Sequence, residues 1–375
     1  MHTDTPSGNQ PPTTSSHRHA AVADRLAARV VALAKVPGLS FAVASSAGLH
    51  YAGATGYADV TAGRPCTPDD QFLWFSMTKI ATATAAMRLH HAHTVDLDEP
   101  IRRHLPDYPR SRWGEPTLRQ LLSHTAGLPN PLPVRWVRPV SQPEDRELVT
   151  RLITKHGAPR REVGTRAAYS NIGYLVAGRV LENATGRSVQ DLVRELVLDP
   201  LNMRRTGFSF QDAAPRAVGY VRVPSLATPA LRALLPRGVV GPRVRGGYTA
   251  FEPFLVSGAA YGGLVGPATD AVRLAAAHLA PATEQALLTG WEVEEMQRIR
   301  HVGKPFDHGI GWFRRPADAG RDPGFVEHYG TGGGYWNAMR VYPALDLAMV
   351  AMANTTATWD FDQLFTGLSE LDWSC

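Results

Sequence analysis

The sequence predicts an α+β protein in which both ends of the chain contribute strands to one antiparallel sheet with flanking helices, and an all-helical domain is inserted between them. Strand-like patterns lie at residues 39–59 and again at residues 309–354, and helical patterns dominate the stretch between. A chain of 375 residues with 44% hydrophobic residues can also bury a large core. We therefore expect a disordered leader at residues 1–19, an α/β domain formed by residues 20–69 and 270–375, and a helical domain at residues 70–269.

The first part of the chain supplies one helix and two strands. Residues 1–19 are rich in Ser, Thr, Pro and His, a composition typical of a disordered leader. Apolar residues recur at helical spacing from Ala20 to Lys35, which predicts an amphipathic helix. The segments LSFAVASS (residues 39–46) and LHYAGATGYAD (residues 49–59) are β-rich and separated by a short turn, so we expect two paired strands.

The last part of the chain supplies the remaining strands. The segments GIGWFRR, FVEHYG, YWNAMRVYP and LDLAMVAMAN are strand-like, and a helix is expected over residues 360–371. In the middle, residues 130–145, which include Trp136, and residues 208–257 are long, Pro-rich and without clear periodicity. Loops of this length are often binding loops, so we expect both to shape a cleft and Trp136 to contact substrate.

Charge and composition exclude several partners. The chain has 39 Lys and Arg against 34 Asp and Glu, but the basic residues are scattered and form no run, so we expect no nucleic-acid partner. No stretch is long and apolar enough to cross a membrane. The longest early apolar run, Val30 to Ala34, is too short for the core of a signal peptide, which favours a cytoplasmic protein.

Neither a metal nor a cofactor is expected. Cys66 and Cys375 match no metal-binding or redox spacing. His90, His91 and His93 lie together at the end of a predicted helix but lack a spaced partner that would complete a metal site.

The run Ser76, Met77, Thr78, Lys79 is the first candidate for chemistry. Only 4 of the 39 basic residues are lysines, so a lysine is kept here in a chain that otherwise uses arginine. Arginine cannot release its proton in a protein, whereas a desolvated lysine can. One helical turn after a serine, such an amine could take the hydroxyl proton and activate the serine as a nucleophile. Taken alone, the run also fits a helix N-cap formed by Ser76.

Three further segments with candidate site residues follow along the chain. They are TLRQLLSHTAGLP at residues 117–129, then Tyr169, Ser170, Asn171 leading into the helical run IGYLVAGRVLENATG, and finally His328, Tyr329, Gly330. With Ser76 and Lys79, this series resembles the beta-lactamase-related serine hydrolases, which include class C beta-lactamases, DD-peptidases, D-aminopeptidases, carboxylesterases and some acyltransferases. The resemblance covers residues 37–356. It implies an antiparallel sheet backed by helices beside a helical domain, with the site in the cleft between them.

The resemblance also implies a role for each residue of the site. Ser76 would attack an acyl carbonyl, Lys79 would accept the serine proton, and Tyr169 would pass it to the leaving group. Asn171 would hydrogen-bond Lys79 and the substrate. The backbone N–H groups of Ser76 and of Thr331, which follows Gly330, would form the oxyanion hole.

The resemblance implies that His328, Gly330 and Thr331 contact the substrate, and His328 departs from the family pattern, because a lysine usually leads the third motif. A fixed positive charge suits the carboxylate of beta-lactams and peptidoglycan stems, whereas a histidine is only partly charged near neutral pH. We therefore expect an esterase or amidase that acts on a small-molecule acyl substrate. A D-amino-acid peptidase or beta-lactamase, an acyltransferase of secondary metabolism, and a non-catalytic sensor with the same fold stay open as alternatives.

Overall fold

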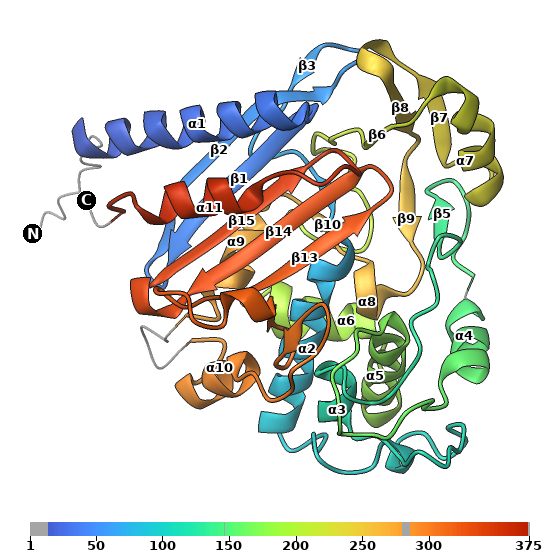
Figure 1. Cartoon of the computed structure of the whole chain (residues 1–375). Helices are drawn as coiled ribbons and strands as arrows, with labels where there is room; N and C mark the ends of the chain where they lie inside the picture. Colours follow the sequence, from blue (N-terminus) through green and yellow to red (C-terminus); the bar gives the residue numbers. More distant parts are fainter. Residues whose placement is uncertain (1–13, 146, 280–285, 374–375) are drawn as a thin grey trace, which may run out of the picture.

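The computed structural model describes residues 14–145, 147–279 and 286–373 (Figure 1). Its centre is an eight-stranded sheet in the order β11-β12-β13-β14-β15-β1-β2-β3, with every neighbouring pair antiparallel. The strands of this sheet are β1 (Gly38–Ser45), β2 (Gly48–Asp59), β3 (Arg64–Pro65), β11 (Asp307–His308), β12 (Phe313–Arg314), β13 (Val326–Gly332), β14 (Tyr335–Tyr342) and β15 (Leu347–Ala353). Because β1 pairs with β15, the predicted sheet built from both ends of the chain is confirmed.

Helices cover both faces of this sheet. On one face lie α1 (Thr14–Ala34) and α11 (Phe361–Ser369), which contact each other and the strands (Figure 1). On the other face α9 (Ala268–Ala276) packs against β1, β2, β14 and β15. All residues of β1 and β15 are buried, as expected for strands enclosed between two helical layers.

Helix α1 begins earlier than the sequence predicts. It starts at Thr14, so the disordered leader expected up to residue 19 is wrong for residues 14–19, while residues 1–13 lie outside the described part. Residues 14–19 are polar but contain neither Pro nor Gly. Extending an existing helix by such residues requires no new nucleation step. Their helix propensities make each residue cost only tenths of a kcal/mol of free energy, about 0.7 at most.

The inserted region is mainly helical but not all-helical, which corrects the prediction. Its helices include α2 (Thr78–His91), α3 (Leu118–Leu122), α4 (Leu148–His156), α5 (Asn171–Thr185), α6 (Val189–Val193), α7 (Thr228–Leu234) and α8 (Ala259–Gly262). The two segments expected to be loops form short strands instead. β5 (Val137–Pro139) pairs with β9 (Phe254–Val256), and β6 (Tyr220–Arg222), β8 (Tyr248–Phe251) and β7 (Val240–Arg243) form a three-stranded sheet.

One hydrophobic core joins the sheet to the inserted helices. Ala42 and Met339 on the sheet belong to the same buried cluster as Ile80 on α2 and Val176 on α5. In the last short pair, β4 (Phe72–Leu73) lies directly before the segment that carries Ser76, and its partner β10 (Val265–Gly266) lies near the end of the inserted region. The chain therefore enters and leaves the inserted region through paired strands, and the domain boundaries at residues 70 and 269 stay a prediction. Within the described residues, no helix has the length and apolar character needed to cross a membrane.

Candidate active site

Ser76 lies in a short 3₁₀ turn, η1 (Phe75–Met77), that runs directly into α2. The residue before it, Phe75, has a φ of 47°, a left-handed conformation that costs a non-glycine residue free energy. No side chain caps α2, so the N-cap interpretation of Ser76 is wrong. The turn instead leaves Ser76 partly exposed, with Lys79 in the first turn of α2.

The amine of Lys79 is buried among three oxygen atoms. Its Nζ lies 3.0 Å from Ser76 Oγ, 2.8 Å from Asn171 Oδ1 and 2.9 Å from the carbonyl oxygen of Tyr261. Burial lowers the pKa of Lys79 well below its ordinary value. A neutral amine has two N–H donors and one lone pair. Because Asn171 Oδ1 and the Tyr261 carbonyl can only accept, the Ser76 hydroxyl is the neighbour that can donate to the lone pair.

Tyr169 completes the hydrogen bonds of the serine. Its phenol donates to Ser76 Oγ over 2.6 Å. Burial raises the pKa of Tyr169, and the hydrogen bond to Ser76 offsets only part of this rise, so the phenol keeps its proton at neutral pH. The arrangement holds a phenol, a hydroxyl and an amine in one continuous chain of hydrogen bonds.

The start of α5 fixes Tyr169 and Asn171 on either side of one capping residue. Ser170 is the N-cap, and its Oγ accepts a hydrogen bond from Gly173 N over 3.1 Å. The backbone N–H of Ser170 donates to His124 Nδ1 over 3.1 Å, and the His124 ring lies 4.5 Å from the Tyr169 ring. The helix cap therefore sets the position of both site residues.

Strand β13 approaches the nucleophile closely because it carries glycines. A Cβ atom at Gly330 would lie 1.9 Å from the carbonyl oxygen of Trp74, and one at Gly332 would lie 2.1 Å from the Phe75 ring. Thr331, between these glycines, lines the same cavity as Ser76. The third motif thus meets the η1 turn through glycine backbone.

The cavity beside Ser76 has a volume of about 330 Å³ and a mostly apolar wall. Its polar residues include Ser76, Asn171, Tyr261, Thr331 and Thr356. The apolar ones are Phe75, Pro133, Val134, Val137, Val221, Leu231, Leu234, Leu235, Val239, Phe251 and Phe254. Both segments predicted to shape the cleft contribute to this wall, and no charged side chain belongs to it within the described part of the chain.

His328 does not line this cavity, which corrects its assignment as a substrate contact. It is fully buried, its ring lies 4.7 Å from that of Phe313, and its Nδ1 donates to the Gly311 carbonyl over 2.6 Å. Burial lowers the pKa of His328 well below its ordinary value. The imidazole is therefore neutral at neutral pH. It shares the inner face of β13 with Gly330, because side chains alternate along a strand.

Trp136 also lies behind the wall rather than in it. It is buried, and its ring meets that of Tyr261 edge-on at 5.6 Å. Tyr261 does line the cavity, so Trp136 acts by supporting it.

Sequence reasoning missed three residues that hold the site together. The Tyr261 carbonyl accepts from Lys79, His124 accepts from Ser170, and Asn130 Oδ1 accepts from the backbone N–H of Asn171 over 3.0 Å. His124 lay within the TLRQLLSHTAGLP segment, which was a usable signal. The contribution of Tyr261 comes from its backbone, which leaves no trace in the sequence.

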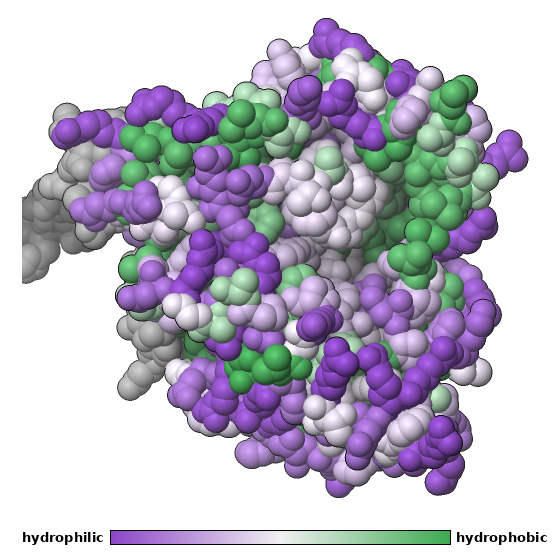
Figure 2. Space-filling model, in the orientation of Figure 1, coloured by the Kyte–Doolittle hydropathy of each residue, from purple (hydrophilic) through white to green (hydrophobic). Residues whose placement is uncertain are grey.

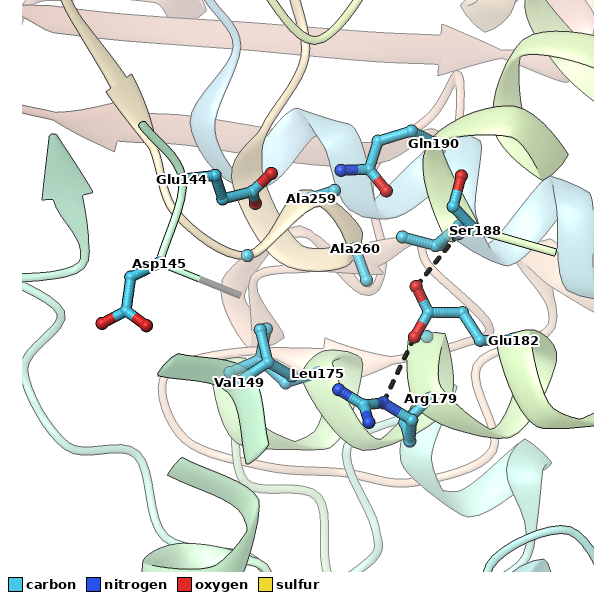
Figure 3. Close-up of a pocket in the computed structure, with 13 residues that line it drawn as sticks. Glu144, Asp145, Val149, Leu175, Arg179, Glu182, Ser188, Gln190, Ala259 and Ala260 are labelled. Atoms are coloured by element: carbon cyan, nitrogen blue, oxygen red, sulfur yellow. Dashed lines mark hydrogen bonds and ion pairs between the residues drawn. The ribbon is translucent and has the colours of Figure 1, made fainter. Parts of the chain in front are cut away.

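A second cavity of about 480 Å³ lies beside α8, and Ala259 and Ala260, the two residues before Tyr261, form part of its wall (Figure 3). Figure 3 shows the carboxylates of Glu144 and Asp145 on one side and the Arg179–Glu182 ion pair on the other. Its one serine, Ser188, caps α6 and has no lysine, histidine or tyrosine beside it in this wall. In the described residues, no group of three or more His, Cys, Asp or Glu side chains could hold a metal ion.

The chain is similar to several known proteins. A family model described as Beta-lactamase matches residues 23–369. The chain is 30% identical over 339 residues to esterase EstB of Burkholderia gladioli, covering 84% of each chain. The hydrolase EstCE1, described as having promiscuous acyltransferase activity, superposes with a TM-score of 0.74 at 22% identity, covering 95% of this chain and all of that one. D-amino acid amidase from Ochrobactrum anthropi SV3 superposes with a TM-score of 0.72 at 24% identity, over 93% and 98% of the two chains. Below 25% identity, these two structures establish the fold alone.

Proposed function

Because the chain belongs to the beta-lactamase family and is a serine hydrolase, we propose that it is an esterase or amidase that forms an acyl-enzyme on Ser76 with small-molecule substrates. The observation that carries the proposal is the buried Lys79 amine 3.0 Å from Ser76 Oγ. The 30% identity to esterase EstB over most of both chains supports the ester-cleaving reading.

In the proposed reaction, Ser76 Oγ attacks the acyl carbonyl while Lys79 takes the hydroxyl proton. This transfer needs the amine to be neutral, which its burial favours. Tyr169, hydrogen-bonded to the same oxygen, passes a proton to the departing alcohol or amine. A water molecule then attacks the acyl-enzyme and gives a proton to the Tyr169 phenolate, and the Lys79 ammonium returns its proton to Ser76 Oγ as the acid is released, so that all three groups are restored.

The oxyanion hole is proposed to consist of the backbone N–H groups of Ser76 and Thr331. Both residues line the cavity, and the glycines that flank Thr331 allow β13 to reach the η1 turn. Donors of this kind are worth about 10²–10³ in rate each. Asn171 presents its Oδ1 to Lys79 and is positioned to offer its amide N–H group to the substrate.

Intact-protein mass spectrometry after incubation with a fluorophosphonate tests the nucleophile. We expect one adduct per chain, lost in Ser76→Ala. Ser188→Ala is the matched control, because Ser188 lines the second cavity and its hydroxyl donates to the Asp191 carboxylate, with no lysine or tyrosine among the described residues of that wall, so this variant must keep the adduct. No adduct with several activated esters and fluorophosphonates would favour a sensor.

A panel of a neutral p-nitrophenyl ester, a D-amino-acid amide and nitrocefin then identifies the acyl substrate, and added alcohols reveal acyl transfer. The cytoplasmic location is proposed from the sequence and is tested by cell fractionation.

A further inference from the structure

We infer that the cavity beside Ser76 takes an uncharged apolar group of the substrate, so that the preferred substrate is a neutral ester with an alkyl or aryl chain. This inference rests on the proposed function, since it assigns the substrate class of the same site. The chain can belong to the acyl part or to the alcohol part of the ester, because both would offer the same chemistry to this wall.

Most of the described residues that form the wall of the cavity are apolar. Leu231 and Leu234 come from α7, Val221 from β6 and Val137 from β5, so three separate elements present aliphatic side chains. Its volume of about 330 Å³ lies at the lower end of the usual range for small-molecule sites, about 300–1,000 Å³. The cavity therefore suits a chain of moderate length.

Aromatic rings make one part of the wall rigid. The rings of Phe75 and Phe254 lie 6.3 Å apart, and those of Phe254 and Phe251 lie 5.9 Å apart. These distances are typical of packed aromatic pairs. Phe75 also directly precedes the nucleophile, so an apolar chain held on these rings stays next to Ser76 Oγ.

Few polar groups in the wall are free to bind a charged chain. Thr356 Oγ1 already accepts from Gly334 N over 2.8 Å and lies 3.4 Å from the Tyr220 carbonyl. The segment of residues 130–145 carries Arg135 and Arg138. Arg135 donates to the Ala233 carbonyl and Arg138 to the Gln142 carbonyl. A carboxylate entering this cavity would lose hydration without gaining a cation, which is costly.

Apolar residues extend from the cavity onto the surface around its opening. Leu234 lines the cavity and is 50% exposed, and Leu132, next to the wall residue Pro133, is 81% exposed. Figure 2 shows hydrophobic side chains gathered over the region where Figure 1 draws α7 and β5, beside a hollow in the same face. An apolar substrate would therefore meet a compatible surface before it enters.

The test measures kcat/KM for p-nitrophenyl esters from acetate to octanoate, and for acetates of alcohols of increasing length. Burying one methylene changes an equilibrium about fourfold, so we expect kcat/KM to rise about threefold to fourfold per methylene in one of the two series until the cavity is full. The series that responds shows whether the acyl or the alcohol part occupies the cavity. Activity toward acetate esters without a rise in either series would overturn the inference and leave the proposed function standing.

Leu231→Gln and Leu226→Gln form a matched pair of variants. Leu231 lines the cavity, whereas Leu226, a few residues earlier, is 93% exposed and does not. We expect L231Q to lower the ratio of octanoate to acetate kcat/KM about tenfold and L226Q to leave it unchanged. Equal ratios in both variants would overturn the inference. Circular dichroism and the melting temperature show whether each variant is folded.

Binding to the Ser76→Ala variant provides a readout that does not depend on turnover. N-phenyl-1-naphthylamine, an uncharged aromatic probe, should gain fluorescence on binding S76A, and an added L231Q but not L226Q should weaken that binding. If the chain fails to label at Ser76 yet binds the probe in this pattern, the proposed function fails while the assignment of the cavity stands. Absence of binding together with a flat chain-length profile would overturn the assignment.

Discussion

The carbonyl oxygen of Tyr261, a backbone group far along the chain, lies 2.9 Å from Lys79 Nζ. It accepts a hydrogen bond from one of the two N–H groups of the neutral amine, and Asn171 Oδ1 accepts one from the other over 2.8 Å. The lone pair is then left for Ser76, 3.0 Å away. This division of roles requires an amine that is not an ammonium ion, and burial favours the neutral form because it lowers the pKa of Lys79.

Lys79→Arg should be nearly as damaging as Lys79→Ala, although it keeps a positive charge. A guanidinium does not accept a proton in a protein, so the general-base step is lost. Such steps contribute about 10²–10⁴ in rate, and we expect kcat for a neutral p-nitrophenyl ester to fall by this amount in both variants. If K79R kept most of the activity, Lys79 would be a structural charge instead of a base.

The pH dependence of kcat/KM for the same ester should follow the two shifted groups. Activity needs neutral Lys79 and protonated Tyr169. Because burial lowers the pKa of Lys79, activity falls only as pH drops through a value well below that of an ordinary lysine. Because burial raises the pKa of Tyr169, activity holds at alkaline pH beyond the range of an ordinary tyrosine. An acid limb at the ordinary lysine pKa would contradict the neutral amine.

Tyr169→Phe should lower kcat by about 10²–10⁴ with little change in KM. Only the hydroxyl is removed, and with it the proton donor 2.6 Å from Ser76 Oγ. The ring remains to pack against His124. Pre-steady-state measurement of acylation checks the step affected, and a change confined to KM would make Tyr169 a wall residue.

Gly330→Ala should impair both stability and activity. Its new Cβ would lie 1.9 Å from the Trp74 carbonyl oxygen, so β13 must move away from the η1 turn and carry Thr331 with it. Displacements near 1 Å at a reacting centre can cost about 10²-fold in rate. Gly320→Ala is the control, since no atom lies within 4 Å of its added Cβ. Equal kcat/KM for the two variants would show that the close approach of β13 is not needed.

Features with long or strongly spaced signals were predictable from the sequence. The mainly apolar segments of β1 and β15 indicated strands, and the spacing of Ser76, Lys79, Tyr169 and Asn171 indicated a site that the structure does bring together. The strands of residues 130–145 and 208–257 were missed. They are only three or four residues long, too short to show a clear alternation, and β5 and β7 each contain a proline.

The position of a side chain relative to the cavity was harder to predict than its place in a motif. His328 follows the motif order but lies on the inner face of β13, where it is buried. Trp136 lies in the expected segment but packs behind Tyr261. Both outcomes depend on how distant segments pack together, which no local pattern records.

The last prediction concerns acid stability and uses His278, which is remote from the site in the sequence and fully buried. Its ring nitrogens lie 2.9 Å from the Leu274 carbonyl and 3.1 Å from Thr84 Oγ1, and burial lowers its pKa to about 4. An unfolded histidine has a pKa near 6.5. Between these two values the unfolded chain binds a proton that the folded chain does not, so the free energy of unfolding decreases as pH falls, by up to about 1.4 kcal/mol per pH unit. In His278→Gln, the free energy of unfolding should therefore depend less steeply on pH between pH 6.5 and 5, by an amount that corresponds to nearly one bound proton. Urea unfolding at several pH values measures this slope. His93→Asn is the control, because His93 is exposed and asparagine tolerates its left-handed backbone, with φ of 54°. If H278Q and H93N gave the same slope as the parent protein, His278 would not be the neutral buried histidine that the structure indicates.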